Sequence, residues 1–578
     1  MSSTTTYINQ LSKRLIFYLG GAWVVVESFS FLVQRYDLDP GLIDLLILLI
    51  LFGFPATLIY SSFQGRWNWK PLLLQVINLV LAFSLIFYYV VHPSILSPDK
   101  LRFLKVTKAP TSEVNDLKGI AVLPFLNNMG EDQGYIVAGM HDGLITEIGK
   151  LGNLKVVSRT SVMPYKDTKK NIRQIAKELE VDALIETSLT KIDTTIALQV
   201  KLINAFPEES IAWTSSNEVS LGAIPNLFRE VTKNVALQIN KVITPAQQEK
   251  LTPQPVLSSA SYEAFLRGWY YTGFLTPEYF SKAEKYFMKA IEKDSLIVAA
   301  YTGLAGLWAS KRQMGYVHPQ LARDTIQTLL QEASIIDPDN AEIFAQYGVE
   351  QTWGTFEWEK AEKSFRKSIE INPNSAGPRI AFAHHLMIMN QWDEAWQQAR
   401  YAESLDPESP WVVSFIGIMY VFDGKILTAS KYIEKLKKIA PDHPLVVEVN
   451  LEKAIALGDY DEAISQLKSL LQRTQLDEID EFIDKTFAES DFETTISKTA
   501  AYLEKKKKSQ FIQTRLIFQL YQIAGETDKQ MEMLLIMHEE GDPSLPYLGG
   551  GPMKALNNHP VFKMVMKDLG LDEYRKQN

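Results

Sequence analysis

The residues of this chain that could do acid–base or metal chemistry are few and dispersed. His141 and Asp142 are adjacent, but neighbours on a helix point about 100° apart and form no proton relay unaided. The run from Arg159 to Ser161 follows a predicted strand, so it is either an anion-binding turn or a plain turn. His384 and His385 also diverge on a helix, and a metal site there needs further ligands that the sequence does not supply.

Composition and motifs exclude several classes of chemistry. Cysteine is absent, which removes disulfides, thiolate nucleophiles and thiolate metal ligands. We find no phosphate loop, Gly-x-Ser-x-Gly elbow, His-Glu-x-x-His or Gly-x-Gly-x-x-Gly motif. A net charge of −9 disfavours a surface that neutralises phosphates. We therefore predict a non-enzymatic protein with no catalytic residue, metal or cofactor, and no nucleic acid as partner.

The N-terminal part of the chain is strongly apolar. Three stretches, residues 15–34, 42–63 and 72–91, reach the roughly 20 apolar residues that a helix needs to cross a membrane. A cleaved signal peptide is the alternative for the first stretch, but its apolar run is longer than usual and no small-x-small cleavage site follows. The sequence predicts a membrane anchor with three transmembrane helices over residues 1–92, followed by a linker over residues 93–116.

Short-loop charges predict an orientation for this anchor. Lys13, Arg14, Arg66 and Lys70 fall on the side of the N-terminal tail, which favours the inside for that side. The expected location is the bacterial inner membrane, with a cytoplasmic N-terminus and periplasmic soluble domains. Glu27, inside the first stretch, is either functional within a helix bundle or a neutral carboxyl with no transport role.

Residues 117–245 change to a mixed α/β pattern. Apolar runs and alternation predict strands, and apolar residues at helical spacing predict helices between and after them. Asn171 is a candidate N-cap for the second helix. The expected strands are residues 120–125, 154–158, 183–189, 195–204 and 211–219, and the expected helices are residues 135–151, 171–179 and 224–243.

This region resembles a TolB-like N-terminal domain, which is often fused to repeat arrays in bacterial membrane proteins. The resemblance rests on IAVLPF from Ile120, GMHDGLITEI from Gly139, KVVSRTSV from Lys155, RQIAKELEVDALIETSL from Arg173, and IAW ending at Trp213. It implies a role in binding and assembly rather than in chemistry.

Internal repetition governs the next part of the chain. Four prolines recur at intervals of 35, 34 and 34 residues, and four alanines recur at 34. A small residue lets paired helices approach closely, and a proline after each pair ends the second helix. A third set of residues suits a left-handed turn between the helices of a pair. These positions are Pro338, Pro373, Pro407 and Pro441; Ala361, Ala395, Ala429 and Ala463; and Asn390, Gly424 and Gly458.

The three sets resemble the tetratricopeptide (TPR) repeat, most closely in residues 410–443, where Gly417, Tyr420, Gly424, Ala429 and Pro441 match the pattern. We expect an all-α solenoid of about six helix pairs over residues 258–475. Residues 476–578 are predicted to be a helical cap and a C-terminal tail. The expected fold class is thus a multidomain chain: a three-helix transmembrane anchor, a mixed α/β TolB-like domain and an all-α TPR solenoid.

Alignment on the repeated alanines predicts a partner-binding groove. The positions that line the concave face in TPR proteins are apolar here, and they are His384, Met387, Trp411, Ile418, Val421 and Phe422. An apolar face suits an amphipathic helix or another apolar segment of a protein partner. The alternative is that these side chains only pack the solenoid, or are covered by the C-terminal helix of the same chain.

Two functions are consistent with these features. The first is a scaffold or sensor in the membrane that binds a protein partner through the groove. The alternative is a signal-transduction protein, in which the membrane helices pass the state of the soluble domains to a separate cytoplasmic output such as a regulator or a cyclase.

Overall fold

The computed structural model describes most of the chain from residue 117 onward. The described residues are 117–152, 154–239, 251–274, 276–441, 443–548, 550, 556 and 558–571. All of them belong to one unit, residues 109–578. Contacts between the sheet and the repeats are therefore contacts within this unit.

The predicted fold class needs correction. The described residues form a mostly helical chain with one small sheet, and none of their helices is both long and apolar enough to cross a membrane. Even α13 (Pro319–Ile336), with 18 residues, carries Arg323, Asp324 and Glu332. On this finding the three-helix transmembrane anchor and the predicted inner-membrane location are not supported. The three expected spans, Glu27 and the linker over residues 93–116 lie outside the described residues.

The α/β part is built on a mixed sheet with the strand order β3-β1-β4-β5-β6, and β2 pairs with β4. Pairings β1–β3, β1–β4 and β2–β4 are parallel, whereas β4–β5 and β5–β6 are antiparallel hairpins. The strands are β1 (Gly119–Val122), β2 (Leu126–Asn128), β3 (Lys155–Val157), β4 (Ala183–Ile192), β5 (Thr195–Asn204) and β6 (Ser210–Ser220). The predicted strands are confirmed, except that the strand expected over residues 120–125 ends at Val122 and a separate strand, β2, follows it.

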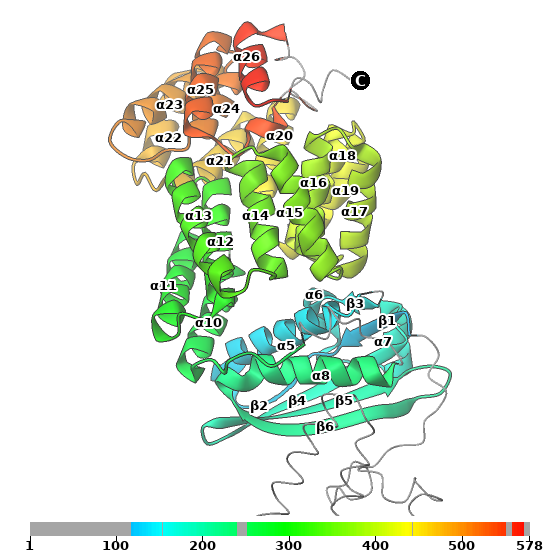
Figure 1. The fold of residues 1–578 in the computed structure, drawn as a ribbon. Coiled ribbons are helices and arrows are strands. Elements are labelled where there is room, and N and C mark those ends of the chain that lie inside the picture. The colour runs from blue at the N-terminus through cyan, green and yellow to red at the C-terminus, as the bar shows by residue number, and fades with distance from the viewer. Residues whose placement is uncertain are drawn as a thin grey trace, which may run out of the picture. The chain divides into compact units, whose positions relative to one another are not determined.

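Helices pack on both faces of the sheet (Figure 1). On one face, α5 (Gly134–Gly149) and α8 (Ile224–Gln238) share a core with the buried side chains of β4 and β5. On the other face, α6 (Arg159–Val162) and α7 (Ile172–Leu179) cover β1 and the start of β4. Asn171 caps α7 in a capping box with Gln174, as predicted.

The core of the sheet continues into the repeats. α5 packs against α10 (Ser259–Thr272), and a Cβ at Gly139 would lie only 2.4 Å from Cδ2 of Leu266. Glycine at this position therefore permits the close approach of the two helices. The same apolar cluster includes Phe287 of the first helix pair, so the α/β part and the repeats do not have separate cores.

Between residues 259 and 471 the described chain forms consecutive helix pairs (Figure 1). Each helix packs against the next along the chain, which is the predicted TPR arrangement. The pairs are α10 with α11 (Pro277–Lys293), α12 (Val298–Gln313) with α13, α14 (Ala341–Trp353) with α15 (Trp358–Ile371), α16 (Ala376–Ile388) with α17 (Trp392–Leu405), α18 (Pro410–Phe422) with α19 (Ile426–Ile439), and α20 (Pro444–Leu457) with α21 (Tyr460–Leu471).

The three repeated residue sets have the predicted roles. The repeated alanines are at most 3% exposed, so each lies where two helices are in close contact. Each repeated proline stands two residues beyond the end of a helix, from α13 to α19. Asn390, Gly424 and Gly458 have φ angles of 62°, 74° and 71°, the left-handed conformation expected between paired helices.

Beyond the repeats the chain remains helical and packs around a second apolar cluster. Here α24 and α25 lie next to the start of α13, where Lys507, Thr514 and His318 surround Glu540. Gln320 of α13 donates a hydrogen bond to the carbonyl oxygen of Glu539 at 3.2 Å. The elements are α22 (Ile479–Glu489), α23 (Phe492–Lys507), α24 (Thr514–Ile523), α25 (Thr527–Glu540), a 3-10 turn over Leu545–Tyr547, and α26 (Pro560–Asp568).

Candidate partner-binding groove

The six residues of the predicted groove lie on α16 and α18, next to α14, and they have unequal exposure. His384 and Met387 are buried, with 0% and 5% of their surface exposed. Ile418, Val421 and Phe422 are half-buried, and Trp411 is 40% exposed and packs on Phe415. Trp411, Ile418 and Val421 therefore form an accessible apolar strip along α18, which we call the α18 strip.

The chain's own C-terminal segment covers the other end of this face. The ring of Tyr547 lies 6.0 Å from the ring of Phe422 and 5.8 Å from that of His384. A Cβ built at Gly550 would lie 2.6 Å from the Phe422 ring. The C-terminal part of the chain therefore covers the groove at His384 and Phe422, as one of the alternatives predicted. The covering element is the turn before α26 and not the C-terminal helix.

A chain of hydrogen bonds fixes Tyr547 in this position. Nε1 of Trp353 donates to the Tyr547 hydroxyl at 3.0 Å, and this hydroxyl lies 3.0 Å from Nδ1 of His384. Nε2 of His384 lies 2.8 Å from the carbonyl oxygen of Phe415. We call the site formed by Trp353, His384, Phe415 and Phe422 the tyrosine pocket.

The adjacent histidines are core residues. Nδ1 of His385 lies 3.0 Å from the Thr352 hydroxyl, whereas the partners of His384 are Tyr547 and Phe415. Burial lowers the pKa of His384 to about 4, against the hydrogen bond to Phe415, and burial together with Arg366 lowers the pKa of His385 to about 4. The two rings diverge, as adjacent helical positions must.

His141 and Asp142 also point in different directions. Nε2 of His141 lies 2.8 Å from the carbonyl oxygen of Val122, and burial lowers the pKa of this histidine to about 4. Burial is the main cause that raises the pKa of Asp142 to about 6; the carboxylates of Asp406 and Glu342 add to it, and Arg159 opposes it. The pair is thus not a proton relay, and Asp142 faces the repeats.

The residues from Arg159 to Ser161 lie in the short helix α6, and they have a carboxylate partner within the chain. Thr160 donates a hydrogen bond to the carboxylate of Asp406, in the turn between α17 and α18. The backbone N–H of Ser158 donates to the carbonyl oxygen of Leu405 at 3.1 Å. The plain turn is therefore not what the structure shows, and the carboxylate that Thr160 binds belongs to the repeats of the same chain.

A second turn of the repeats binds the free edge of β3. The Asn374 side chain accepts a hydrogen bond from the backbone N–H of Val156 at 3.2 Å and donates to the carbonyl oxygen of Gly149 at 2.9 Å. Asn372 and Asp406 each directly precede a repeated proline, so two successive inter-repeat turns contact the α/β part. Edge strands need such cover to prevent unwanted pairing.

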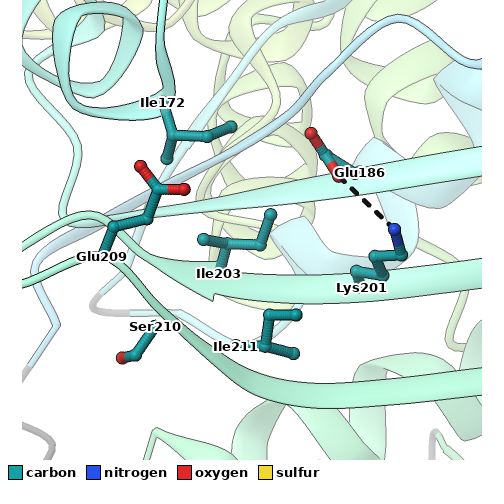
Figure 2. Close-up of a pocket in the computed structure, with 7 residues that line it drawn as sticks. All are labelled: Ile172, Glu186, Lys201, Ile203, Glu209, Ser210 and Ile211. Atoms are coloured by element: carbon teal, nitrogen blue, oxygen red, sulfur yellow. Dashed lines mark ion pairs between the residues drawn. The ribbon is translucent and has the colours of Figure 1, made fainter.

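A hollow of about 240 Å³ lies on the side of β4, β5 and β6 near the start of α7 (Figure 2). Its floor includes Ile203 and Ile211, and Glu186 pairs with Lys201 at 4.0 Å across neighbouring strands. Both charges of this pair are about half exposed. The pair therefore contributes little energy, and no arrangement for catalysis stands out among the lining residues.

The sequence did not predict two residues of the tyrosine pocket, Trp353 and Phe415, or its occupant Tyr547. Trp353 ends α14 as Phe422 ends α18, but a one-residue insertion before α15 obscures this equivalence. Tyr547 lies between helices, where no periodicity exists to place it. Its contact with Trp353 spans 194 residues of chain.

Comparisons with known proteins find limited similarity. No protein-family model matches the chain, so the resemblance to a TolB-like domain gains no support. A curated relative, "Putative adenylate cyclase 3" from Rhizobium meliloti (strain 1021), is 25% identical over 163 residues, which are 28% of this chain and 28% of the relative. The chain thus spans less than a third of that relative's length.

Two solved structures are similar to about a third of the chain. One is pilF of Pseudomonas aeruginosa, with 16% identity and a TM-score of 0.26, covering 37% of this chain and 92% of that one. The other is TTC0263, a TPR protein of Thermus thermophilus, with 14% identity and a TM-score of 0.27, covering 37% and 100%. At such TM-scores these likenesses carry no inference; the TPR assignment rests on the helix pairs and repeated residues described above.

Proposed function

We propose that this protein is a non-enzymatic interaction scaffold whose repeats bind a segment of a partner protein along the groove. One observation supports the proposal most directly: the groove already holds part of the same chain, residues 545–548 and Gly550. The side chain of Tyr547 contacts both apolar rings and polar atoms of this face, so the groove can bind an aromatic side chain of a peptide segment.

The α18 strip is the part of the groove that is accessible to a partner. An exposed apolar strip beside a polar surface is typical of a protein-binding site. Since the segment bound within the chain is a short 3-10 turn, we favour a short apolar segment as ligand over an amphipathic helix of several turns.

Site-specific photo-crosslinking tests this proposal. A crosslinking residue at Val421, followed by mass spectrometry, identifies the partner, and Trp411→Gln with Ile418→Gln should lower the crosslink yield by at least about ten-fold. Leu427→Gln is the matched control, because Leu427 is an 86% exposed apolar residue at the start of α19. Equal yields from the double variant and the control would argue against the groove as the binding site.

The curated relative favours a second candidate, a regulatory part of a signalling system that acts on a separate nucleotide cyclase. The support is the shared segment with a protein named as a putative adenylate cyclase. Cyclic AMP in cells with and without the gene distinguishes the two. If the gene changes the level of cyclic AMP and the Trp411→Gln and Ile418→Gln double variant no longer does so, signalling through the groove is favoured. An unchanged level of cyclic AMP favours a scaffold alone.

A further inference from the structure

The hydrogen bonds around Tyr547 admit one arrangement of protons. The carbonyl oxygen of Phe415 is only an acceptor, so Nε2 of His384 carries the proton and Nδ1 is left to accept. The Tyr547 hydroxyl therefore donates to Nδ1 of His384 and accepts from Nε1 of Trp353. The tautomer follows from these partners. A single hydroxyl thus satisfies one donor and one acceptor that converge on one point.

Both polar groups that meet this hydroxyl are buried. His384 is 0% exposed and Trp353 is 1% exposed. A phenylalanine in the pocket would leave the indole N–H and the imidazole nitrogen without partners, which is costly in a buried site. The pocket therefore discriminates a phenol from a plain aromatic ring.

The backbone around Tyr547 is held in place by the neighbouring residues and does not depend on the Tyr547 side chain. Its neighbours Leu545 and Leu548 are 0% and 2% exposed and belong to the apolar cluster of the C-terminal helices. Rotation of the Tyr547 side chain out of the pocket leaves those two anchors in place. A tyrosine from another chain would restore the same hydrogen bonds, so the exchange costs little at the pocket, and contacts with the α18 strip would favour the incoming segment.

We infer that the tyrosine pocket determines the specificity of the groove, and that the partner segment inserts a tyrosine side chain in place of Tyr547. This inference rests on the proposed function, since it assumes that the groove binds a protein segment. It adds the chemical identity of the residue that the groove recognises.

The pocket itself can be tested with small probes. In the full chain, Tyr547→Ala opens a cavity of the size of a phenol, and calorimetry compares p-cresol with toluene, which has the same shape without the hydroxyl. We expect p-cresol to bind at least about ten-fold more tightly than toluene to this variant, and neither probe to occupy the pocket of the wild-type protein. Equal affinity of the two probes would overturn the inference.

The partner side can be tested with a random-peptide display library selected against Tyr547→Ala. Enriched peptides should share a tyrosine, and replacement of that tyrosine by phenylalanine should weaken binding by at least about ten-fold. Enriched peptides without a common tyrosine would refute the inference. If Tyr547→Ala does not fold, Tyr547→Phe replaces it in the selection, because its ring preserves the packing but makes neither hydrogen bond, so a tyrosine from a peptide displaces it more readily than it displaces Tyr547.

Different experimental results would refute the scaffold function and the tyrosine specificity of the pocket. A partner crosslinked at Val421 whose binding is insensitive to a tyrosine-to-phenylalanine change in its own segment would leave the scaffold function standing and remove the tyrosine specificity. Tyrosine-dependent peptide binding without any crosslinked partner would leave the pocket specificity standing and remove the scaffold function in the cell.

Discussion

The hydroxyl of Tyr547 lies 3.0 Å from Nδ1 of His384, a contact between residues that are 163 positions apart. It joins the turn before α26 to the middle of α16, so it connects the C-terminal part of the chain to the repeats. Trp353 donates to the same hydroxyl from α14. One side chain therefore links three segments of the solenoid.

Loss of this hydroxyl should destabilise the fold. Tyr547→Phe leaves two buried polar groups unpaired, and we expect the free energy of unfolding to fall by about 1–3 kcal/mol in urea denaturation. Tyr460→Phe is the control, since Tyr460 is 40% exposed and stacks on Phe492, and it should change stability by less than about 0.5 kcal/mol. If Tyr547→Phe is as stable as the control variant, the two hydrogen bonds make no net contribution to the free energy of unfolding.

Mild acid should weaken the molecule through its buried histidines. His141, His384 and His385 each have a folded-state pKa of about 4, below the ordinary value of 6.5. The folded protein therefore binds these protons less tightly than the unfolded chain, so their contribution to stability is present above pH 6.5 and is lost as the pH falls toward 4.

We expect the urea midpoint to drop steadily between pH 6.5 and 4.5. His384→Asn, which removes one of the three titrating rings, should have a shallower slope than the wild-type protein over the same range. Identical slopes would show that His384 does not change its protonation on unfolding.

Asp142 should act in the opposite direction. Its pKa is raised from 3.8 to about 6, mainly by burial. The protonated form is favoured on folding, so this contribution is complete below pH 3.8 and is lost as the pH rises through about 6. Asp142→Asn, which stays neutral, should therefore be more stable than the wild-type protein by about 1–2 kcal/mol at pH 7.5 and differ little from it at pH 4. A difference that does not depend on pH would contradict this account.

Local signals in the sequence were sufficient for most elements of the α/β part. Alternation predicted residues 195–204 as a strand, and β5 spans Thr195–Asn204. Residues 120–125 were predicted as one strand, but Pro124 has no N–H for a sheet hydrogen bond, and the chain divides into β1 and β2 on either side of it. Pro124 was therefore the residue that indicated the break between β1 and β2.

Contacts between distant parts could not be predicted in this way. Periodicity tells which face of a helix is apolar, but not which distant segment covers it. Six groove positions followed from the repeat period, whereas Tyr547 follows from a contact that depends on how the C-terminal helices turn back. The hydrogen bond from Thr160 to Asp406 spans 246 residues, and nothing in the local pattern of either turn indicates the other.

The repeats contain a matched pair of glycines that tests their packing. Gly348 and Gly417 occupy equivalent positions on α14 and α18, but a Cβ at Gly348 would lie 2.7 Å from the Phe365 ring, whereas at Gly417 it would lie 3.4 Å from Cβ of Tyr432. Gly348→Ala should lower the free energy of unfolding by about 1–3 kcal/mol through overpacking. Gly417→Ala should raise it by up to about 1 kcal/mol, because alanine favours a helix. Similar effects at both sites would exclude the Phe365 contact as the cause.

The junction between the sheet and the repeats should be measurable at the edge of β3. Asn374→Ala removes the hydrogen bonds to the N–H of Val156 and to the carbonyl oxygen of Gly149, and leaves the N–H of an edge strand without its partner. We expect amide hydrogen exchange at Val156 to accelerate by at least about ten-fold, with little change at Leu198 in the middle of β5. Asn234→Ala is the control, because the side-chain amide of Asn234 donates to the carbonyl of Glu230 within α8, away from the edge of β3. If Val156 keeps its wild-type protection in Asn374→Ala, then this repeat turn does not hold the edge of β3, and the core at Leu266 and the contacts with Leu405 and Asp406 must join the two parts.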